Sequence, residues 1–340
     1  MKELLKTLCA LDGVSSWEDA VRDYLYAEAE PYADSLRVDA LGSLIVSKRG
    51  KKPAGNKVML CAHMDEVGLM VRRITDEGYL KFDAVGSLDR RVLLGKPVRV
   101  SPKGIPGVVG LKAYHLVSRE EEKSVPKLDE FYIDIGAKDK AGAEAQVSLG
   151  DVAAFDSTAG EFGGGLFQGK ALGSRVGCAV LLTLLKEKLP LDCTFVFTAQ
   201  EEVGNRGAFG AGFSVTPEIA LVLETTTAAD LPDTPEHKKV CRLGQGPVVS
   251  FMDRGTVYNM ELYRALLARA RQEGIACQPK TGVYGGNEAQ SLISSKAGVK
   301  VLAVSLPCRY LHSPSCVLQK SDLCETLRLL RAAIALAGGQ

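Results

Sequence analysis

The segment V-M-L-C-A-H-M-D-E, residues 58–66, decides the predicted fold. Its first five residues are all apolar, which is typical of a strand buried on both faces of a sheet. A polar cluster follows without a break, in His63, Asp65 and Glu66. In open parallel sheets, ligands bind beyond the carboxyl ends of the strands. The segment therefore predicts an α/β fold with a polar site where this strand ends.

Three further apolar segments end in polar residues in the same way. They are residues 193–198, followed by Glu201 and Glu202; residues 219–223, followed by Glu224; and residues 301–306, followed by His312. A single acidic residue at a strand end is usually a solvated turn residue, so no segment is informative alone. Because the carboxyl ends of parallel strands meet at one edge of a sheet, the four ends together can bring two histidines and three glutamates to one point.

The rest of the chain alternates between helix and strand, and a segment with a different sequence pattern interrupts this alternation. Residues 1–67 and 163–340 combine apolar strands with amphipathic helical patterns. Residues 68–162 hold short alternating stretches broken by Gly, Pro and Asp, which favours a small all-β unit. We predict a discontinuous α/β domain, with a mainly parallel sheet flanked by helices, interrupted by an inserted β domain.

One helix start is also predicted. Ser15 and Glu18 stand at the spacing of a capping box, and apolar residues follow at helical intervals. This pattern predicts a helix in which Ser15 is the N-cap and Glu18 the third helical residue.

The composition of the 340 residues excludes several classes of protein. The net charge is +1 with no basic run, which argues against nucleic-acid binding. Hydrophobic residues make up 46% and charged residues 24%, the ordinary globular range. Aromatic residues make up 6%, too few for the stacking platforms of a polysaccharide binder. We therefore expect no nucleic-acid partner.

The cysteines and the N-terminal segment favour the cytoplasm. Nine cysteines show no C-x-x-C pair, and several lie in apolar segments, where a reduced thiol packs as a small hydrophobe. Glu3 and Lys6 interrupt the apolar stretch at the N-terminus, unlike the core of a signal peptide. No apolar run reaches the roughly 18 residues of a membrane span, so we expect no membrane partner.

The residue types at the strand ends suit a metal-dependent hydrolase. Imidazole nitrogens and carboxylate oxygens are the usual ligands of catalytic zinc, whose sites keep one position open for water. In H-x-D, the carboxylate of Asp65 can accept the second ring N–H of His63 and fix its tautomer. Glu201 and Glu202 point different ways as neighbours, so one can bind metal while the other acts as general base.

Six segments resemble one family, the glutamyl aminopeptidases and tetrahedral aminopeptidases, which are di-metal peptidases. The segments keep the family's order and span nearly the whole chain: HMDEVG (63–68), IDIGA (133–137), EEVG (201–204), FMDR (251–254), GGNEA (285–289) and RYLHS (309–313). Some members of the family carry the label endoglucanase.

This resemblance implies a fold and a set of roles. The fold is an α/β peptidase domain with an inserted β-barrel used for assembly into homo-oligomers of up to twelve subunits. The substrates are short peptides with a free N-terminus, and the metals are zinc or cobalt, two per chain. The implied metal ligands are His63 with Glu224 and Glu202 with His312. Glu201 would be the general base for a metal-bound water, and Asp65 would orient His63.

The segment ALGSRVG, residues 171–177, departs from the family pattern. The family carries at position 173 an aspartate that bridges the two metals, whereas this chain has Gly173. Each metal then keeps two protein ligands, and the anion that screens two dications about 3.5–4 Å apart is lost. The sequence therefore leaves open whether two metals, one or none are bound.

Two alternatives to an active aminopeptidase remain at this level. Gly173 favours an impaired or inactive family member that acts as an assembly subunit or a binding protein. A glycoside hydrolase needs two carboxylates at a defined separation, which sequence neighbours such as Glu201 and Glu202 match poorly.

Overall fold

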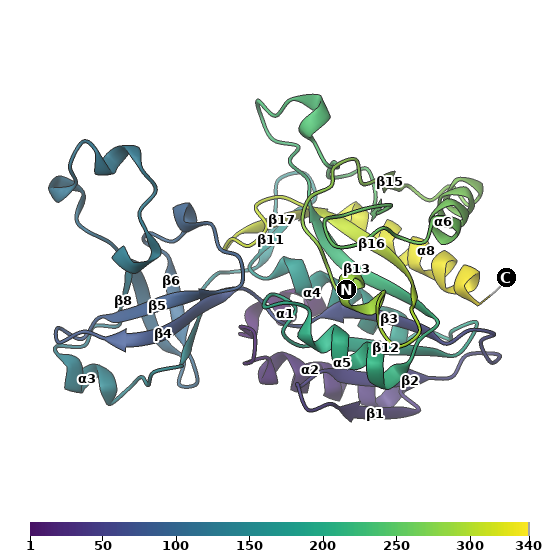
Figure 1. Ribbon diagram of the computed structural model, residues 1–340, viewed down its shortest axis with the longest axis horizontal. Coiled ribbons are helices and arrows are strands. Elements are labelled where there is room, and N and C mark those ends of the chain that lie inside the picture. The colour runs from purple at the N-terminus through teal and green to yellow at the C-terminus, as the bar shows by residue number, and fades with distance from the viewer. Residues whose placement is uncertain (339–340) are drawn as a thin grey trace.

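The computed structural model describes residues 1–338 and contains two parts that lie side by side (Figure 1). One part is an α/β sandwich built from both ends of the chain, and the other is a closed β-barrel formed by its middle. The predicted fold class is therefore confirmed.

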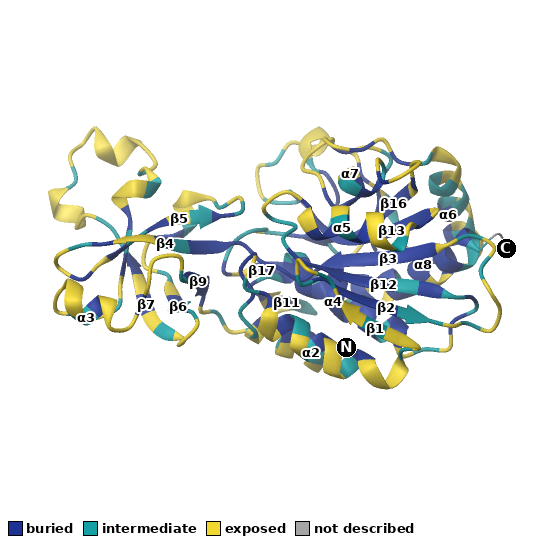
Figure 2. Cartoon of the chain, turned by 60° about the horizontal axis from the view of Figure 1, so that its bottom comes forward, coloured by how far each residue is buried: buried dark blue, intermediate teal, exposed yellow. Residues whose placement is uncertain are grey.

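The α/β part is built on an eight-stranded sheet. In spatial order its strands are β1 (Ser35–Val38), β2 (Leu44–Lys48), β12 (Cys193–Thr198), β3 (Val58–His63), β13 (Ile219–Thr227), β16 (Lys300–Cys308), β14 (Val248–Val249) and β15 (Gln278–Pro279). The four central strands, from β12 to β16, are parallel, whereas β2 and β14 pair with their inner neighbours in antiparallel fashion. All six residues of β3 are buried, as its apolar run predicts (Figure 2).

Helices cover both faces of this sheet. One face packs against α1 (Lys2–Ala10), α2 (Asp19–Ala29), α4 (Leu172–Leu185) and α8 (Lys320–Ala337), with α6 (Met260–Gln272) lying against α8. The other face packs against α5 (Arg206–Val215) and α7 (Ala289–Leu292). Twelve of the fourteen residues of α4 are buried, so this helix is the centre of the larger core. Among residues 1–338, no helix has both the length and the apolarity needed to cross a membrane.

The barrel has its own core. Its strands, in order around the barrel, are β4 (Gly68–Ile74), β5 (Leu80–Val85), β8 (Tyr132–Asp134), β7 (Ile105–Gly110), β6 (Pro97–Val100) and β9 (Val152–Phe155), with α3 (Lys140–Glu144) beside them. Leu69, Phe82, Val98 and Ile133 are among the side chains that fill it. A small sheet follows the barrel in the chain, with β11 (Leu166–Gly169) between β10 (Gly160–Phe162) and β17 (Cys316–Gln319).

The start of α2 differs from the prediction. The helix begins at Asp19 with Glu18 as its N-cap residue, so the capping box at Ser15 is wrong. Ser16 has φ = 73°, a left-handed conformation that a helix cannot include. Glu18 Oε1 instead accepts hydrogen bonds from the backbone N–H groups of Ser16 and Gln200, both at 2.9 Å. The carboxylate therefore ties the N-terminal loop to the loop that follows β12.

All nine cysteines are free thiols, and most are buried. Burial raises the pKa of Cys9 and of Cys178 to about 12, so these thiols stay protonated at neutral pH. Cys61, Cys178 and Cys193 pack as small apolar side chains, as their positions in apolar segments predict.

The close packing of α4 on the sheet depends on Gly177. A Cβ atom at this position would lie 2.8 Å from Ala62 Cβ and 3.0 Å from the backbone oxygen of Leu223. We expect Gly177→Ala to lower the free energy of unfolding by about 1–3 kcal/mol, because α4 must move away from β3 and β13. Chemical denaturation measures this change.

Gly210→Ala in α5 is the matched control. The added methyl group there would meet other side chains at 3.7 Å or more, which is ordinary contact. We expect its stability to stay the same or to rise by up to about 1 kcal/mol, because alanine favours helix over glycine. Equal losses in both variants would contradict this account of the packing.

Candidate metal centre

The polar ends of the four central strands meet in one cavity of about 420 Å³. Its lining includes His63, Glu201, Glu202, Glu224 and His312. The strand ends are brought together because β12, β3, β13 and β16 run parallel and end at the same edge of the sheet. Asp65 lies directly behind the cavity wall and is fully buried. The structure thus gathers all six residues that the sequence singled out.

His63 and Glu224 form the first donor pair. His63 is the last residue of β3, and the parallel register that pairs Cys61 with Val222, extended by two residues, brings His63 level with Glu224. Their side chains therefore leave neighbouring strands at one level, and Nε2 of His63 lies 3.5 Å from Oε1 of Glu224.

His312 and Glu202 form the second pair, with His312 Nε2 3.3 Å from Glu202 Oε1. Both residues lie on loops, after β16 and β12 respectively. The barrel also reaches this point, because Ser87 and Gly86 follow β5 and Ser87 lines the same cavity. A Cβ atom at Gly86 would lie 3.2 Å from Glu202 Cβ, so the loop passes closely over the second pair.

The spacing of both pairs fits divalent metal ions. Two ligand atoms bound to one tetrahedral zinc, each roughly 2.1 Å from the ion, lie about 3.4 Å apart. The observed separations of 3.5 Å and 3.3 Å match this value. In addition, one ligand atom each of His63, Glu201 and Glu202 lies within 4.8 Å of the others. The chain therefore contains a His/Glu cluster suited to metal binding.

Asp65 organises the residues around it. Its Oδ1 lies 3.2 Å from Nδ1 of His63 and accepts the backbone N–H of Glu201 at 2.9 Å. Its Oδ2 accepts the backbone N–H of Glu202 at 3.0 Å and the hydroxyl of Ser15 at 2.6 Å. Burial would raise the pKa of Asp65, but its hydrogen bond with His63 is the first of several contacts that lower it below its usual range. The carboxylate thus stays charged and holds both glutamates and the imidazole.

The carboxylates of the cavity are crowded. Burial raises the pKa of Glu202 to about 8; His63 opposes the shift, and Asp65 and Glu224 add to it. Burial also raises the pKa of Glu201 well above its usual range, with Glu224 and Glu202 as neighbouring negative charges. Groups in this arrangement ionise together only when positive charge is placed among them. Bound cations would supply that charge.

Gly173 lies in the wall of this cavity, at the start of α4. It is the second residue of α4 and lines the cavity with both pairs. It offers no side chain to the site, and neighbouring Ser174 is buried and accepts a hydrogen bond from Arg175. The described residues therefore place no carboxylate at this position.

Left-handed backbone conformations cluster around the cavity. Ala171 has φ = 56°, Gln200 has φ = 58° and His312 itself has φ = 59°. Non-glycine residues adopt this conformation rarely, and it persists where surrounding contacts impose it. These turns direct the start of α4, the carboxylate of Glu201 and the imidazole of His312 toward the cavity.

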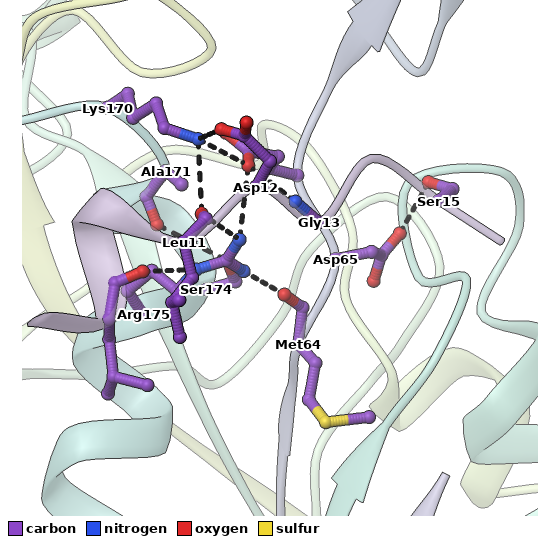
Figure 3. A network of polar contacts seen from close by, with 12 residues as sticks. Leu11, Asp12, Gly13, Ser15, Met64, Asp65, Lys170, Ala171, Ser174 and Arg175 are labelled. Carbon is purple, nitrogen blue, oxygen red and sulfur yellow. Dashed lines mark hydrogen bonds and ion pairs between the residues drawn. The ribbon is translucent and has the colours of Figure 1, made fainter. Parts of the chain in front are cut away.

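A buried ion network joins Lys170 and Arg175 to the loops of Asp12 and Met64 (Figure 3). Oε1 of Glu66 accepts bonds from Lys170 Nζ at 2.7 Å and Arg175 Nη2 at 3.1 Å. Arg175 also donates to the backbone oxygen of Met64. The loop that carries Asp65 is therefore fixed by two buried cations near the start of α4, Lys170 and Arg175.

The network extends into the barrel. Lys170 Nζ also contacts Asp12 Oδ1 at 2.9 Å, and Asp12 forms a two-point ion pair with Arg99 of β6 at 2.7 and 2.9 Å. The chain of charges from Glu66 to Arg99 thus joins the α/β part to the barrel.

Several of these residues were missed by the sequence analysis. Lys170 and Arg175 are almost fully buried. The sequence feature that could have indicated this burial is the presence of charged residues shortly before the long apolar run 176–185. Glu288 is fully buried and accepts a hydrogen bond from Thr198, and burial raises its pKa to about 7. No spacing in the sequence indicates that contact. His115 and His237 are exposed and lie outside the cavity lining.

Comparison with known proteins points to one family. A family model described as M42 glutamyl aminopeptidase matches residues 42–329. The chain is 30% identical over 341 residues to the lysyl aminopeptidase of Pyrococcus furiosus, covering 98% of this chain and 96% of that protein. Similarity to that family was inferred from the motifs and is confirmed.

Solved structures agree. An aminopeptidase from the archaeon Desulfurococcus kamchatkensis has a TM-score of 0.93 at 34% identity, covering 98% of this chain and 94% of its own. The TET1 peptidase of Pyrococcus horikoshii, which can assemble into a tetrahedron or a large octahedral shell, has a TM-score of 0.86 at 34% identity. That similarity covers 97% of this chain and 98% of the TET1 chain.

The buried network makes a prediction about stability. We expect Arg175→Met to lower the free energy of unfolding by about 3–5 kcal/mol, because Glu66 loses one of its two cationic partners inside the protein. Arg331→Met removes an exposed pair with Glu187 and should cost less than about 1 kcal/mol. Urea denaturation compares the two variants. A loss at Arg175 no larger than that at Arg331 would contradict the structural role of the network.

Proposed function

Because the chain belongs to the M42 glutamyl aminopeptidase family and is thus a hydrolase of the aminopeptidase kind, we propose that it releases N-terminal residues from short peptides in a metal-dependent reaction. The observation that carries this proposal is the pair of His–Glu donor sets, at 3.5 Å and 3.3 Å, beside a further glutamate in one cavity. The cavity volume lies within the range of small-ligand sites, which suits a short substrate.

The metals are assigned to the two donor pairs. In this proposal His63 and Glu224 hold one divalent ion, and Glu202 and His312 hold the other, with zinc or cobalt as the metal. Such ions would supply Lewis acidity, polarising the scissile carbonyl and making a water a better nucleophile.

Glu201 is assigned as the general base. It lines the cavity but belongs to neither donor pair, so its carboxylate is free to take a proton from water and pass it to the leaving amine. Asp65 acts as a positioning residue, because it holds the backbone N–H of Glu201 and faces Nδ1 of His63. Ser15 fixes Asp65 in turn.

There are two alternative functions. Gly173 favours a non-catalytic subunit or binding protein of the same fold, which would retain the assembly but not turn over peptides. A glycoside hydrolase is disfavoured, because Glu201 and Glu202 are sequence neighbours, and one carboxylate oxygen of each belongs to a group of ligand atoms that spans at most 4.8 Å. Retaining and inverting enzymes place their carboxyl groups about 5–5.5 Å and 6.5–9.5 Å apart.

We also propose separate roles for two domains of the chain. Residues 1–67 and 163–340 would form the peptidase domain, and residues 68–162 the assembly domain of a homo-oligomer, with twelve subunits as the expected size. The six barrel strands all lie between residues 68 and 155, which supports this division, whereas β10 (Gly160–Phe162) already pairs with β11 of the peptidase part. Exposed apolar side chains on the barrel region, such as Tyr114 at 79% and Leu116 at 60% exposure, support a contact surface there.

The free, buried thiols suit the reducing cytoplasm.

The catalytic assignment is tested with Glu201→Gln. We expect kcat for unblocked aminoacyl substrates to fall by about 10²–10⁴-fold, because general acid–base catalysis contributes that much. Metal content should stay the same, since Glu201 belongs to neither donor pair. Glu261→Gln, an exposed change on α6, is the control and should leave kcat unchanged.

Two results would overturn the assignment. Unchanged turnover in Glu201→Gln would remove Glu201 from the mechanism. A wild-type protein that binds metal but hydrolyses no unblocked substrate would favour the non-catalytic alternative.

The assembly proposal predicts a change of size. We expect the double variant Tyr114→Glu with Leu116→Glu to sediment as a smaller species than the wild type, because charges would be placed in an apolar contact. Leu41→Glu, at an exposed turn of the α/β part, is the control. A wild type that sediments as a monomer would contradict the proposal.

A further inference from the structure

The space above Gly173 is open. An added Cβ atom would meet nothing closer than Leu311 Cδ1 at 3.6 Å and Thr225 Oγ1 at 3.8 Å. The glycine has an ordinary helical backbone, so its lack of a side chain is not required by its conformation. Both donor pairs line the cavity into which this space opens.

Two divalent ions at these pairs would need an anion between them. Ions of like charge about 3.5–4 Å apart are held in two-metal sites by shared ligands. Outside the two pairs, the described lining of this cavity holds one more carboxylate, Glu201, which the proposed function uses as a base. The chain itself thus leaves the place between the ions without a dedicated ligand.

Thr225 points to a missing partner at this place. Its side chain is buried, with 5% of the residue exposed, yet its hydroxyl has no hydrogen-bond partner among the described residues. Buried hydroxyl groups normally have one, because an unmade bond is destabilising. Here the orphaned hydroxyl faces the space above Gly173.

The start of α4 favours negative charge at the same place. Gly173 lies in the first turn of a 14-residue helix whose N-cap, Ala171, provides no side-chain cap. Helix N-termini attract anions, because their first backbone N–H groups have no acceptor within the helix. An anion above Gly173 would therefore lie at a helix N-terminus and beside a free hydroxyl, in the cavity that both donor pairs line.

We propose that a small free carboxylate, of the size of formate or acetate, occupies the space above Gly173 and bridges the two metal ions, accepting a hydrogen bond from Thr225. This inference rests on the metal centre of the proposed function. Acetate supplies a carbon and a carboxylate, the atoms that a glycine lacks relative to an aspartate. The bridging ligand would then come from solution, and metal occupancy would depend on it.

The test measures metal binding rather than activity. The full-length chain is stripped with a chelator, and zinc or cobalt is added by equilibrium dialysis at equal pH and ionic strength, in chloride or in acetate. We expect two ions per chain in acetate and an affinity for the second ion lower on the order of 10- to 100-fold in chloride. Addition of acetate to the cobalt-loaded protein should also change its visible absorption spectrum.

Three variants isolate the site. Gly173→Asp should bind two ions in both buffers, because it carries its own carboxylate. Gly173→Ala adds a methyl group at ordinary contact distances and should fold, but its binding should not respond to acetate, because the methyl group fills the space. Thr225→Val should bind acetate more weakly, because it loses the hydroxyl.

A further arm identifies the source of the carboxylate. Leucine offers the larger carboxylate of a reaction product and is tested in place of acetate. A response to acetate but not to leucine supports a small free carboxylate, whereas a response to leucine alone overturns it.

Three other results would overturn the inference. Equal binding of two ions by the wild type in both buffers would mean that a group of the chain bridges them. Two ions in Gly173→Asp, with a wild type indifferent to acetate, would mean that no carboxylate enters. If neither protein bound metal in either buffer, the metal centre of the proposed function would fail as well.

Discussion

The arrangement of the cavity depends on one buried carboxylate. Asp65 lies two residues after the end of β3, where it accepts hydrogen bonds from the backbone N–H groups of Glu201 and Glu202 and faces His63. These contacts join loops from two neighbouring strands. A carboxylate so placed fixes one member of each donor pair, the imidazole of His63 and the backbone of Glu202. Its burial makes the arrangement rigid, since each oxygen is fully used.

The central strands, and the polar residues that follow each of them, could be predicted because their causes are local. The apolar run 58–62 needs burial on both faces, and only the centre of a parallel sheet provides it. The polar residues after each such run then meet by topology alone. This explains why His63, Glu224 and His312 could be placed together from the sequence without any knowledge of the distances between them.

Other features depend on contacts distant in sequence and could not be predicted. Helix α5 has three glycines in ten residues, a poor intrinsic helix, and it forms because Gly207 allows close contact with Ala199, where a Cβ would lie 2.4 Å from the backbone oxygen. The capping box at Ser15 failed because Ser15 has a stronger partner in Asp65. The open space above Gly173 also needed coordinates, since a sequence shows which side chain is missing but not whether neighbours have filled its place.

The ion pairs that run from Arg99 through Asp12 and Lys170 to Glu66 make the two parts depend on each other. Cutting the barrel out and rejoining the ends would leave Asp12 without its guanidinium and would strip Ser87 from the wall of the cavity. The barrel therefore cannot be removed without the loss of contacts around the cavity. Any insertion or exchange that reshapes it therefore also acts on the charges that hold the loop of Asp65.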